Sequence, residues 1–576
     1  MKQDTWREFR AEVETAVSAA LKELKVETPT VIDKAPEGKG DLAFPCFPLA
    51  KQLRKAPNAI AQDLCAKIKP RGMIDKVEVS GGYVNFHVKY EDLAQTVLDW
   101  AVASKDKFGS GEQKKTRILL EHTSANPTGP LHVGRARNPI IGDSLARIIR
   151  LAGYPVTTEF YVNDVGRQVI TMAWGVKNLK LETEPDRDAD HFRYVLYYQQ
   201  ANKRMEEDPK ALEETDAMLH KLEHGDPETV KLARETCERV LSGIMESLRR
   251  INIDVNGFTW ESKYVQDGSV DGIIEQLKKS EFARELEGAY HLELESFGIT
   301  GRETKWVFTR SDGTSLYTTR DLAYHIEKFK RTDVAINILG EDQRLAMQEL
   351  AAALSIMGIN KKPEIVYYAF VSLPEGRMST RRGTVVYLDD LLDEAVDRAY
   401  EEVKKRRTDL PEERMKEIAR IVGTGALRYN VIRIQAEKQI VFKWEDALNI
   451  EGNSAPFIQY AHARACSILR KAREEGAGGA GPFDAKLLTH EQEKSLLKTL
   501  ASMPSVISDC AENRRAHTLA AYAQDLAAQF NQFYRYVPVL KAEGGTRSAR
   551  LALVEASMWA MRNSLTCLGI EAPQEM

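Results

Sequence analysis

One segment of the chain combines the residue types of a phosphate-binding site. It reads Asn126-Pro-Thr-Gly-Pro-Leu-His132-Val-Gly134-Arg135 and lies between an apolar run that predicts a strand and a longer run that predicts a helix. Gly134 allows a close approach of the backbone to a ligand, and a helix start offers unpaired N–H groups to an anion. His132 and Arg135 add donors for a triphosphate, although a histidine here can equally cap the helix. The P-loop sequence G-x-x-x-x-G-K-[ST] occurs nowhere in the chain.

A second segment carries a dense group of arginines. It reads Gly376-Arg377-Met378-Ser379-Thr-Arg381-Arg-Gly383 and follows a predicted strand. Arginine keeps its charge and binds phosphate oxygens with two N–H groups at once, so such a loop suits closure over a polyanion. The alternative is a solvated basic turn.

Strand and helix patterns alternate around these two segments, which predicts a Rossmann-like parallel sheet with helices on its faces. The charged helical stretch at about 170–260 is expected to be an insertion into this sheet domain. The predicted strands are 117–121, 156–162, 305–309, 333–339 and 364–371, and the predicted helix after the first signature is 132–152.

The regions on either side of the sheet differ from it, which predicts three domains. Residues 1–110 show a helical period of apolar residues and then two strands around Gly81 and Gly82, which indicates a small α+β domain. From residue 411 onward only helical patterns occur, which indicates an all-α helical bundle. We therefore expect domains at 1–110, 111–405 and 406–576.

Composition narrows the class of protein. The chain has 576 residues, a formal net charge of −4 and six scattered cysteines with no C-x-x-C pair, so a disulfide framework or structural zinc is not expected and a reducing cytoplasm fits. No apolar run is long enough for a membrane span. His220 and His224 have metal-ligand spacing but lack a third ligand, so we expect a solvated helical face and no metal site.

Taken together, the two segments resemble the HIGH and KMSKS signatures of class I aminoacyl-tRNA synthetases. Four further segments narrow the resemblance to the arginyl-tRNA synthetase family, and it covers essentially the whole chain. Arg135, Arg377 and Arg381 stand where the class usually has histidine or lysine, and all three substitutions keep a cationic donor. The segments are Leu120-Glu-His-Thr-Ser-Ala-Asn126, Tyr161-Val-Asn-Asp-Val-Gly-Arg-Gln168, Ser311-Asp-Gly-Thr-Ser-Leu-Tyr317-Thr-Thr-Arg-Asp321 and Glu451-Gly-Asn-Ser-Ala-Pro-Phe-Ile-Gln459-Tyr-Ala-His-Ala-Arg464.

The resemblance implies a site for ATP and one for L-arginine. At the arginine site, Asp321 accepts from the guanidinium, Tyr317 packs on the side chain, and Glu121 and Asn126 hold the α-amino end. Ser124 holds the carboxylate, and Gln343 is a further polar contact, whereas Tyr324 fits core packing better. The implied ATP and catalytic residues are Pro130, His132, Gly134, Arg135, Arg377, Met378, Ser379 and Arg381.

The resemblance also implies that tRNA(Arg) is bound at both ends of the chain. Tyr83 and Asn85 correspond to the part that reads the D-loop, with Phe86 expected in the core. Gln459, Tyr460 and Arg464 lie in the anticodon-binding domain. Because most aromatic residues there have helical spacing, each is individually more typical of core packing.

Three further properties follow from the resemblance: Mg²⁺ accompanies ATP, the enzyme is a monomer, and bound tRNA is needed before arginine is activated. Two alternatives remain open at this stage. One is a ligase that uses the same adenylate chemistry without tRNA, and the other is an inactive protein that only binds tRNA or a partner.

Overall fold

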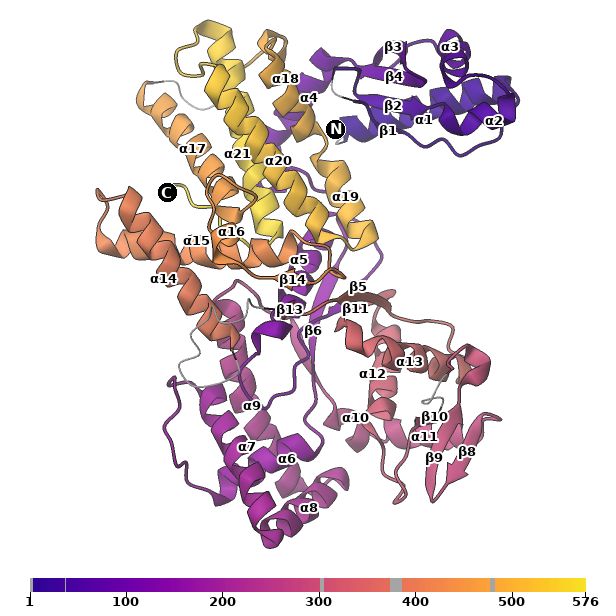
Figure 1. The fold of residues 1–576 in the computed structure, drawn as a ribbon, viewed down its shortest axis with the longest axis vertical. Helices are drawn as coiled ribbons and strands as arrows, with labels where there is room; N and C mark the ends of the chain where they lie inside the picture. Colours follow the sequence, from indigo (N-terminus) through magenta and orange to yellow (C-terminus); the bar gives the residue numbers. More distant parts are fainter. Residues whose placement is uncertain (1–3, 37, 301–304, 373–385, 477–481) are drawn as a thin grey trace.

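The computed structural model describes residues 4–36, 38–300, 305–372, 386–476 and 482–576. Its first unit is a four-stranded antiparallel sheet in the order β1-β2-β4-β3, packed with helices (Figure 1). Gly81 and Gly82 connect the last two strands with φ angles of 58° and 90°, which glycine adopts without strain. The elements are α1 (Thr5–Glu23), β1 (Asp33–Lys34), β2 (Leu42–Pro45), α2 (Ala50–Leu53), α3 (Pro57–Lys67), β3 (Ile74–Ser80), β4 (Tyr83–Val88) and α4 (Tyr90–Ser104).

The centre of the molecule is a five-stranded sheet in the order β12-β11-β5-β6-β7, and every neighbouring pair is parallel. The chain order reverses between β5 and β11, and ligands of such sheets bind outside the carboxyl ends of the strands at that reversal. The predicted Rossmann-like fold is confirmed. The strands are β5 (Ile118–Glu121), β6 (Val156–Val162), β7 (Gly257–Trp260), β11 (Val334–Gly340) and β12 (Glu364–Tyr368).

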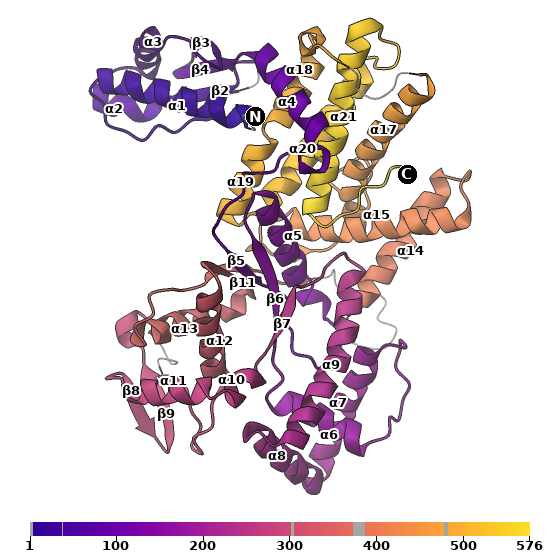
Figure 2. The same ribbon diagram turned by 180° about the vertical axis from the view of Figure 1, so that it is seen from behind.

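Helix α5 (Arg137–Leu151) follows β5 after a 3-10 turn at Val133–Arg135. Twelve of its residues are buried, because it lies between the sheet and the C-terminal helices. Helices α12 (Tyr317–Arg331) and α13 (Arg344–Ile356) lie beside β11, on the side away from α5 (Figure 2).

Four helices form a lobe between the adjacent strands β6 and β7, where the sequence predicts a helical insertion. They are α6 (Arg167–Asn178), α7 (Asp190–Glu207), α8 (Pro209–Glu223) and α9 (Pro227–Arg249). The short strand β7, at the end of this charged stretch, was not predicted. Its four residues give too few alternations to stand out from the helices before it.

One predicted strand belongs to a different sheet. Lys305–Val307 forms β10 and pairs antiparallel with its neighbour β9, so the expectation that it joins the parallel sheet is wrong. An apolar alternation identifies a strand but not its partner. The other elements here are α10 (Ser262–Gln266), α11 (Ser269–Lys278), β8 (Ala283–Leu286) and β9 (Ala289–Glu293).

The C-terminal region is a helical bundle that packs against α5. The expectation of helices alone needs one correction, because the two-residue strand β14 (Ile440–Val441) pairs with β13 (Val371–Ser372). The helices are α14 (Leu388–Arg406), α15 (Glu412–Ile432), α16 (Trp444–Ala447), α17 (Ala455–Glu474), α18 (Glu491–Ala501), α19 (Met503–Asn513), α20 (Ala516–Tyr536) and α21 (Gly544–Cys567).

Candidate active site

A cavity of about 470 Å³ opens at the carboxyl ends of β5, β6 and β11 and is closed on one side by α12. It lies where the chain order of the sheet reverses, the place at which this class of fold binds ligands. All six side chains predicted to bind arginine line it, and so does Arg135. The six are Glu121, Ser124, Asn126, Tyr317, Asp321 and Gln343.

The loop after β5 is held in a strained conformation. Thr123 and Ser124 have φ angles of 71° and 37°, which residues other than glycine rarely adopt. Ser124 Oγ donates to Glu121 Oε1 at 2.8 Å and accepts from the backbone N–H of Tyr161 at 3.0 Å. These bonds keep the loop against β6, and strain of this kind is typical of functional sites.

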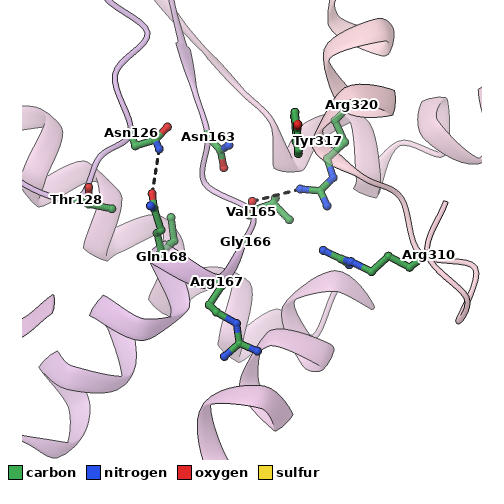
Figure 3. Close-up of a pocket in the computed structure, with 11 residues that line it drawn as sticks. Asn126, Thr128, Asn163, Val165, Gly166, Arg167, Gln168, Arg310, Tyr317 and Arg320 are labelled. Carbon is green, nitrogen blue, oxygen red and sulfur yellow. Dashed lines mark hydrogen bonds between the residues drawn. The ribbon is translucent and has the colours of Figure 1, made fainter. Parts of the chain in front are cut away.

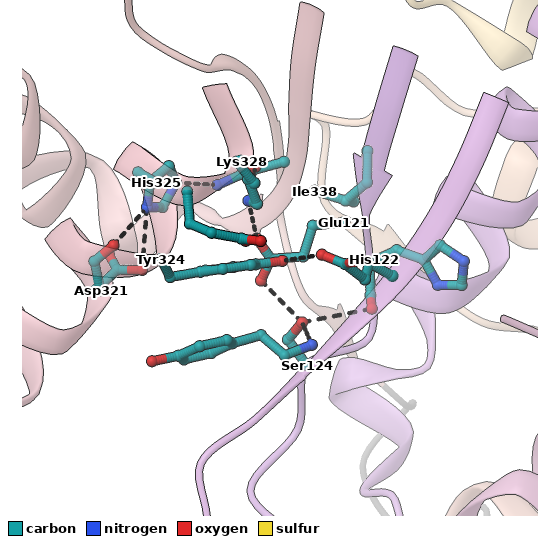
Figure 4. A network of polar contacts seen from close by, with 12 residues as sticks. Glu121, His122, Ser124, Asp321, Tyr324, His325, Lys328 and Ile338 are labelled. Atoms are coloured by element: carbon teal, nitrogen blue, oxygen red, sulfur yellow. Dashed lines mark hydrogen bonds and ion pairs between the residues drawn. The ribbon is translucent and has the colours of Figure 1, made fainter. Parts of the chain in front are cut away.

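The Glu121 carboxylate is buried, and both of its oxygens already accept a hydrogen bond, from Ser124 and from Lys328. Its Oε2 lies 2.5 Å from Lys328 Nζ, and Lys328 is fully buried (Figure 4). A carboxylate has about four acceptor positions, so Glu121 can still accept a hydrogen bond from a ligand. A lysine on α12 therefore neutralises the acidic end of β5.

Helix α12 presents both exposed and buried groups to the cavity. Tyr317 is 65% exposed, and the Asp321 side chain is 30% exposed. Burial raises the pKa of Asp321. The contact with His325 and the charge of Lys328 together lower it by a larger amount, so the pKa lies below its ordinary value. Asp321 is therefore an anion ready to receive a cation.

Tyr324 belongs to the core, as the sequence favours. Its ring stacks on Tyr161 with centroids 4.4 Å apart, and its hydroxyl donates to Glu159 at 3.1 Å. Among the described residues, the buried hydroxyl of Tyr161 has no hydrogen-bond partner. That hydroxyl is thus a polar group available to a ligand in the cavity.

The sequence prediction missed Glu261, an acidic residue that lines the cavity and is 1% exposed. Burial raises its pKa to about 7, although Arg320 donates to it at 2.6 Å and opposes the shift. Glu261 directly follows β7, so its position at the ligand edge could have been found only if that strand had been recognised.

The first signature lies beside this cavity. His132 Nδ1 accepts a hydrogen bond from the N–H of Gly134 at 3.0 Å, so the histidine does cap the turn. Burial and the charge of Arg135 lower the pKa of His132, which favours a neutral ring with its proton on Nε2. His132 therefore has one N–H left to donate. Pro130 is half-buried in the same loop.

The second signature, with Arg377, Met378, Ser379 and Arg381, lies outside the described residues.

A smaller cavity of about 240 Å³ adjoins the first and shares Asn126, Asn163 and Tyr317 with it (Figure 3). Asn126 donates to Gln168 at 2.9 Å, which ties the first signature to the start of α6. Arg310 also lines this smaller cavity. The larger cavity thus borders a recess that is lined by Arg167, Arg310 and Arg320 beside the inserted helices.

Of the residues predicted to contact tRNA in the helical bundle, Tyr460 is exposed and Arg464 is half-buried. Tyr460 is 42% exposed, and the guanidinium of Arg464 lies 4.7 Å from its ring centroid. Gln459 is fully buried, and its amide donates to the carbonyls of Ile421 and Glu571. In this conformation Gln459 cannot reach a bound RNA, so its prediction as a direct contact needs correction.

In the N-terminal unit, Tyr83 is half-buried and packs edge-on against Phe47 with centroids 5.1 Å apart. Asn85 is 1% exposed, and neither polar atom of its side chain has a partner among the described residues. Phe86 is fully buried, in line with its expected core role.

Comparisons with known proteins match the chain along its length. The family model "tRNA synthetases class I (R), catalytic domain" matches residues 97–444. The model "Arginyl tRNA synthetase N terminal domain" matches residues 9–88, and "DALR anticodon binding domain" matches residues 458–576. The chain belongs to the arginyl-tRNA synthetase family.

Individual members of the arginyl-tRNA synthetase family agree with this assignment. The arginine–tRNA ligase of Methanocella arvoryzae is 49% identical over 92% of each chain. That of Methanothermobacter thermautotrophicus is 43% identical over 99% of this chain and 100% of its own. The solved arginyl-tRNA synthetase of Thermus thermophilus superposes with a TM-score of 0.82 at 31% identity, covering 98% of this chain and all of its own.

The described residues contain neither a metal-binding cluster nor a membrane-spanning helix. Within them, no three His, Cys, Asp or Glu side chains come together as a metal site. None of the helices in the same part of the chain combines the length and apolar character needed to cross a membrane.

Proposed function

We propose that the chain is an arginine–tRNA ligase that joins L-arginine to the 3′ end of tRNA(Arg). The carboxylate of arginine attacks the α-phosphorus of ATP, pyrophosphate leaves, and the terminal ribose hydroxyl of tRNA then displaces AMP from the arginyl-adenylate. The observation that carries this proposal is the cavity at the sheet reversal, which places an ionised aspartate on α12 beside the first signature.

A guanidinium is planar and permanently charged, so it needs acidic acceptors and a flat surface. Asp321 and Tyr317 supply these on consecutive turns of α12, and we assign them to the guanidinium end. Glu121 and Asn126 hold the α-amino group, and Ser124 holds the carboxylate once its hydroxyl turns from Glu121 toward the ligand. Gln343 is a further polar contact and lines the same cavity.

For ATP, His132 donates through Nε2–H to a phosphate oxygen, and Arg135 neutralises charge on the triphosphate. Gly134 keeps the backbone close to the nucleotide, and Pro130 shapes the loop. Mg²⁺ enters with the phosphates of ATP, which supply oxygen ligands of the kind that it prefers. From the second signature, the assigned residues are Arg377, Met378, Ser379 and Arg381.

For tRNA, Tyr460 and Arg464 form an exposed stacking platform in the helical bundle, of the kind that holds unpaired bases. Tyr83 contacts the D-loop, and Asn85, which is as buried as Gln459, supports its strand from inside. Gln459 supports the platform helix from inside.

We assign one role to each of three domains. Residues 1–110, 111–405 and 406–576 act as D-loop-binding, catalytic and anticodon-binding domains, which is supported by the order of the three family models. The enzyme works as a monomer in the cytoplasm, without zinc. Bound tRNA is required before arginine is activated.

The deciding experiment is arginine-dependent exchange of pyrophosphate into ATP, with and without tRNA. Exchange that needs both arginine and tRNA supports the enzyme and its tRNA requirement. Exchange without tRNA rejects that requirement and favours a tRNA-independent ligase. If folded protein gives no exchange in either case, the chain is an inactive binding protein and the proposal fails.

A further inference from the structure

A continuous series of hydrogen-bonded side chains, buried except for Asp321, connects the two ends of the proposed arginine site (Figure 4). It runs from Asp321 through His325 on α12 to Asn337 on β11, and on through Lys328 to Glu121 on β5. His325 and Asn337 are each 1% exposed, and Lys328 is fully buried. Because these three side chains have almost no exposed surface, each of their polar groups is expected to find its partner among neighbouring side chains.

The donors and acceptors in this chain can be assigned without ambiguity. Lys328 has only donors, so the Asn337 atom 2.8 Å from its Nζ must be the amide oxygen. The amide nitrogen of Asn337 therefore faces His325 Nε2, also at 2.8 Å. An amide nitrogen only donates, so His325 Nε2 accepts, and the neutral ring carries its hydrogen on Nδ1.

That Nδ1–H points at Asp321. The Nδ1 atom of His325 lies 2.8 Å from the backbone oxygen of Asp321 and 3.2 Å from its carboxylate Oδ1. The hydrogen is shared between the two oxygens of one residue, so it ties the carboxylate to the helix backbone. Asp321 otherwise lies on the wall of the cavity, where its side chain could rotate.

The opposite assignment is unfavourable. A proton on His325 Nε2 would face the amide hydrogens of Asn337. Turning that amide would relieve the clash but would set its hydrogens against the ammonium of Lys328. Either arrangement leaves buried donors facing each other, which costs their full desolvation.

We propose that Asn337 holds His325 in its Nδ1–H form and that His325 thereby acts as a positioning residue, fixing the Asp321 carboxylate for the guanidinium of arginine. This inference rests on the proposed role of Asp321 in binding arginine. Through Lys328 and Glu121 the same series of side chains links the guanidinium end of the site to the α-amino end. The distance between the carboxylates of Asp321 and Glu121 is therefore fixed. A substrate with a shorter or longer side chain would fit only one of them.

Two substitutions at His325 separate positioning from simple packing. In His325→Asn the side-chain nitrogen can occupy the place of Nδ1 and still donate to Asp321. In His325→Gln the amide reaches only the place of Nε2, where its oxygen can accept from Asn337, and no donor remains at the place of Nδ1. The assay is aminoacylation of tRNA(Arg) by the full chain, with KM measured separately for arginine and ATP, and thermal unfolding confirms that each variant is folded.

We expect His325→Asn to keep the KM for arginine within about threefold of the original. His325→Gln is expected to raise it about tenfold, the effect of losing one hydrogen bond to a charged group. The KM for ATP and kcat should stay within about twofold in both. Equal KM values for arginine in the two variants, or a loss confined to kcat, would overturn the inference.

A variant that leaves the histidine in place provides an independent test. Asn337→Leu removes the amide that donates to His325 Nε2, so the ring no longer has to carry its hydrogen on Nδ1, and the KM for arginine is expected to rise. The same change made in His325→Asn should have little further effect on that KM. If its effect is equally large in both backgrounds, His325 and Asn337 do not act together and the inference fails. An original chain that charges no arginine would instead reject the proposed function.

Discussion

Arg428 on α15 joins three separate segments and offers a direct measure of how firmly the bundle is attached to the catalytic sheet. It is fully buried, and its guanidinium donates to the carbonyl of Leu568 at 2.8 Å, to the carbonyl of Ile251 and to Asp143 at 2.6 Å. Asp143 lies on α5, Ile251 follows the inserted lobe, and Leu568 follows the last helix.

Replacement by methionine, Arg428→Met, keeps the apolar stem and removes every donor. The two carbonyls then lose a buried partner, at a cost of about 1–3 kcal/mol each. Asp143 keeps its bonds to Arg147 at 2.9 Å and 3.0 Å, so it is not left unpaired. The expected loss in the free energy of unfolding is about 3–5 kcal/mol, in the middle of the summed cost for the two carbonyls.

The assay is urea unfolding followed by tryptophan fluorescence. With an m value of about 3 kcal/mol/M, the midpoint should fall by about 1–1.7 M. The control is Arg420→Met on the same helix, because Arg420 also bonds the C-terminal segment, through Glu571 at 2.7 Å, but its side chain is 46% exposed. That variant should lose less than about 1 kcal/mol. If the two variants behaved alike, the reasoning from burial would be refuted.

Three further predictions concern single residues. In Gly134→Ala the new Cβ would lie 3.1 Å from His132 Nδ1 and push the ring aside, so pyrophosphate exchange should show a KM for ATP raised about tenfold and an unchanged KM for arginine. Burial lowers the pKa of His122 to about 4, although the charge of Asp143 opposes this shift. Because the folded protein holds this ring neutral, the free energy of unfolding should be highest above pH 6.5 and fall by about 3 kcal/mol toward pH 4. Urea midpoints across this range should flatten in His122→Asn, and an unchanged slope would contradict the assignment. Tyr460→Ala should raise the KM for tRNA about tenfold through lost stacking, whereas Phe297→Ala, which removes a similarly exposed ring elsewhere, should not.

The sequence predicted most of the central sheet because its strands are apolar runs that stop at polar loops. β6 was predicted with its exact bounds, and β5, β11 and β12 were predicted within a few residues. β7 was missed because it is short and follows charged helices. Glu261 was missed with it, since a glutamate in such a stretch reads as a surface residue.

Burial of polar residues was the harder property to predict. Gln459 and Asn85 lie in segments that match functional patterns, yet both are buried. The sequence shows that a residue can form hydrogen bonds, but its partners come from distant segments. Gln459 bonds Glu571, more than one hundred residues further along. The pairing of β10 with β9 was not predicted either, because an apolar alternation identifies a strand but not its partner.

The burial of α5 on nearly every side has a consequence for synthesis on the ribosome. Its outer face is covered by α15, α19, α20 and α21, which are the last parts of the chain to be made. At about 5–20 residues per second, roughly 20–80 s pass between the synthesis of α5 and that of its final cover. During that interval the growing chain carries an apolar helix without its partners, and the catalytic core can close only when translation is almost complete. A ribosome stalled before α21 would therefore hold a nascent chain that binds chaperones.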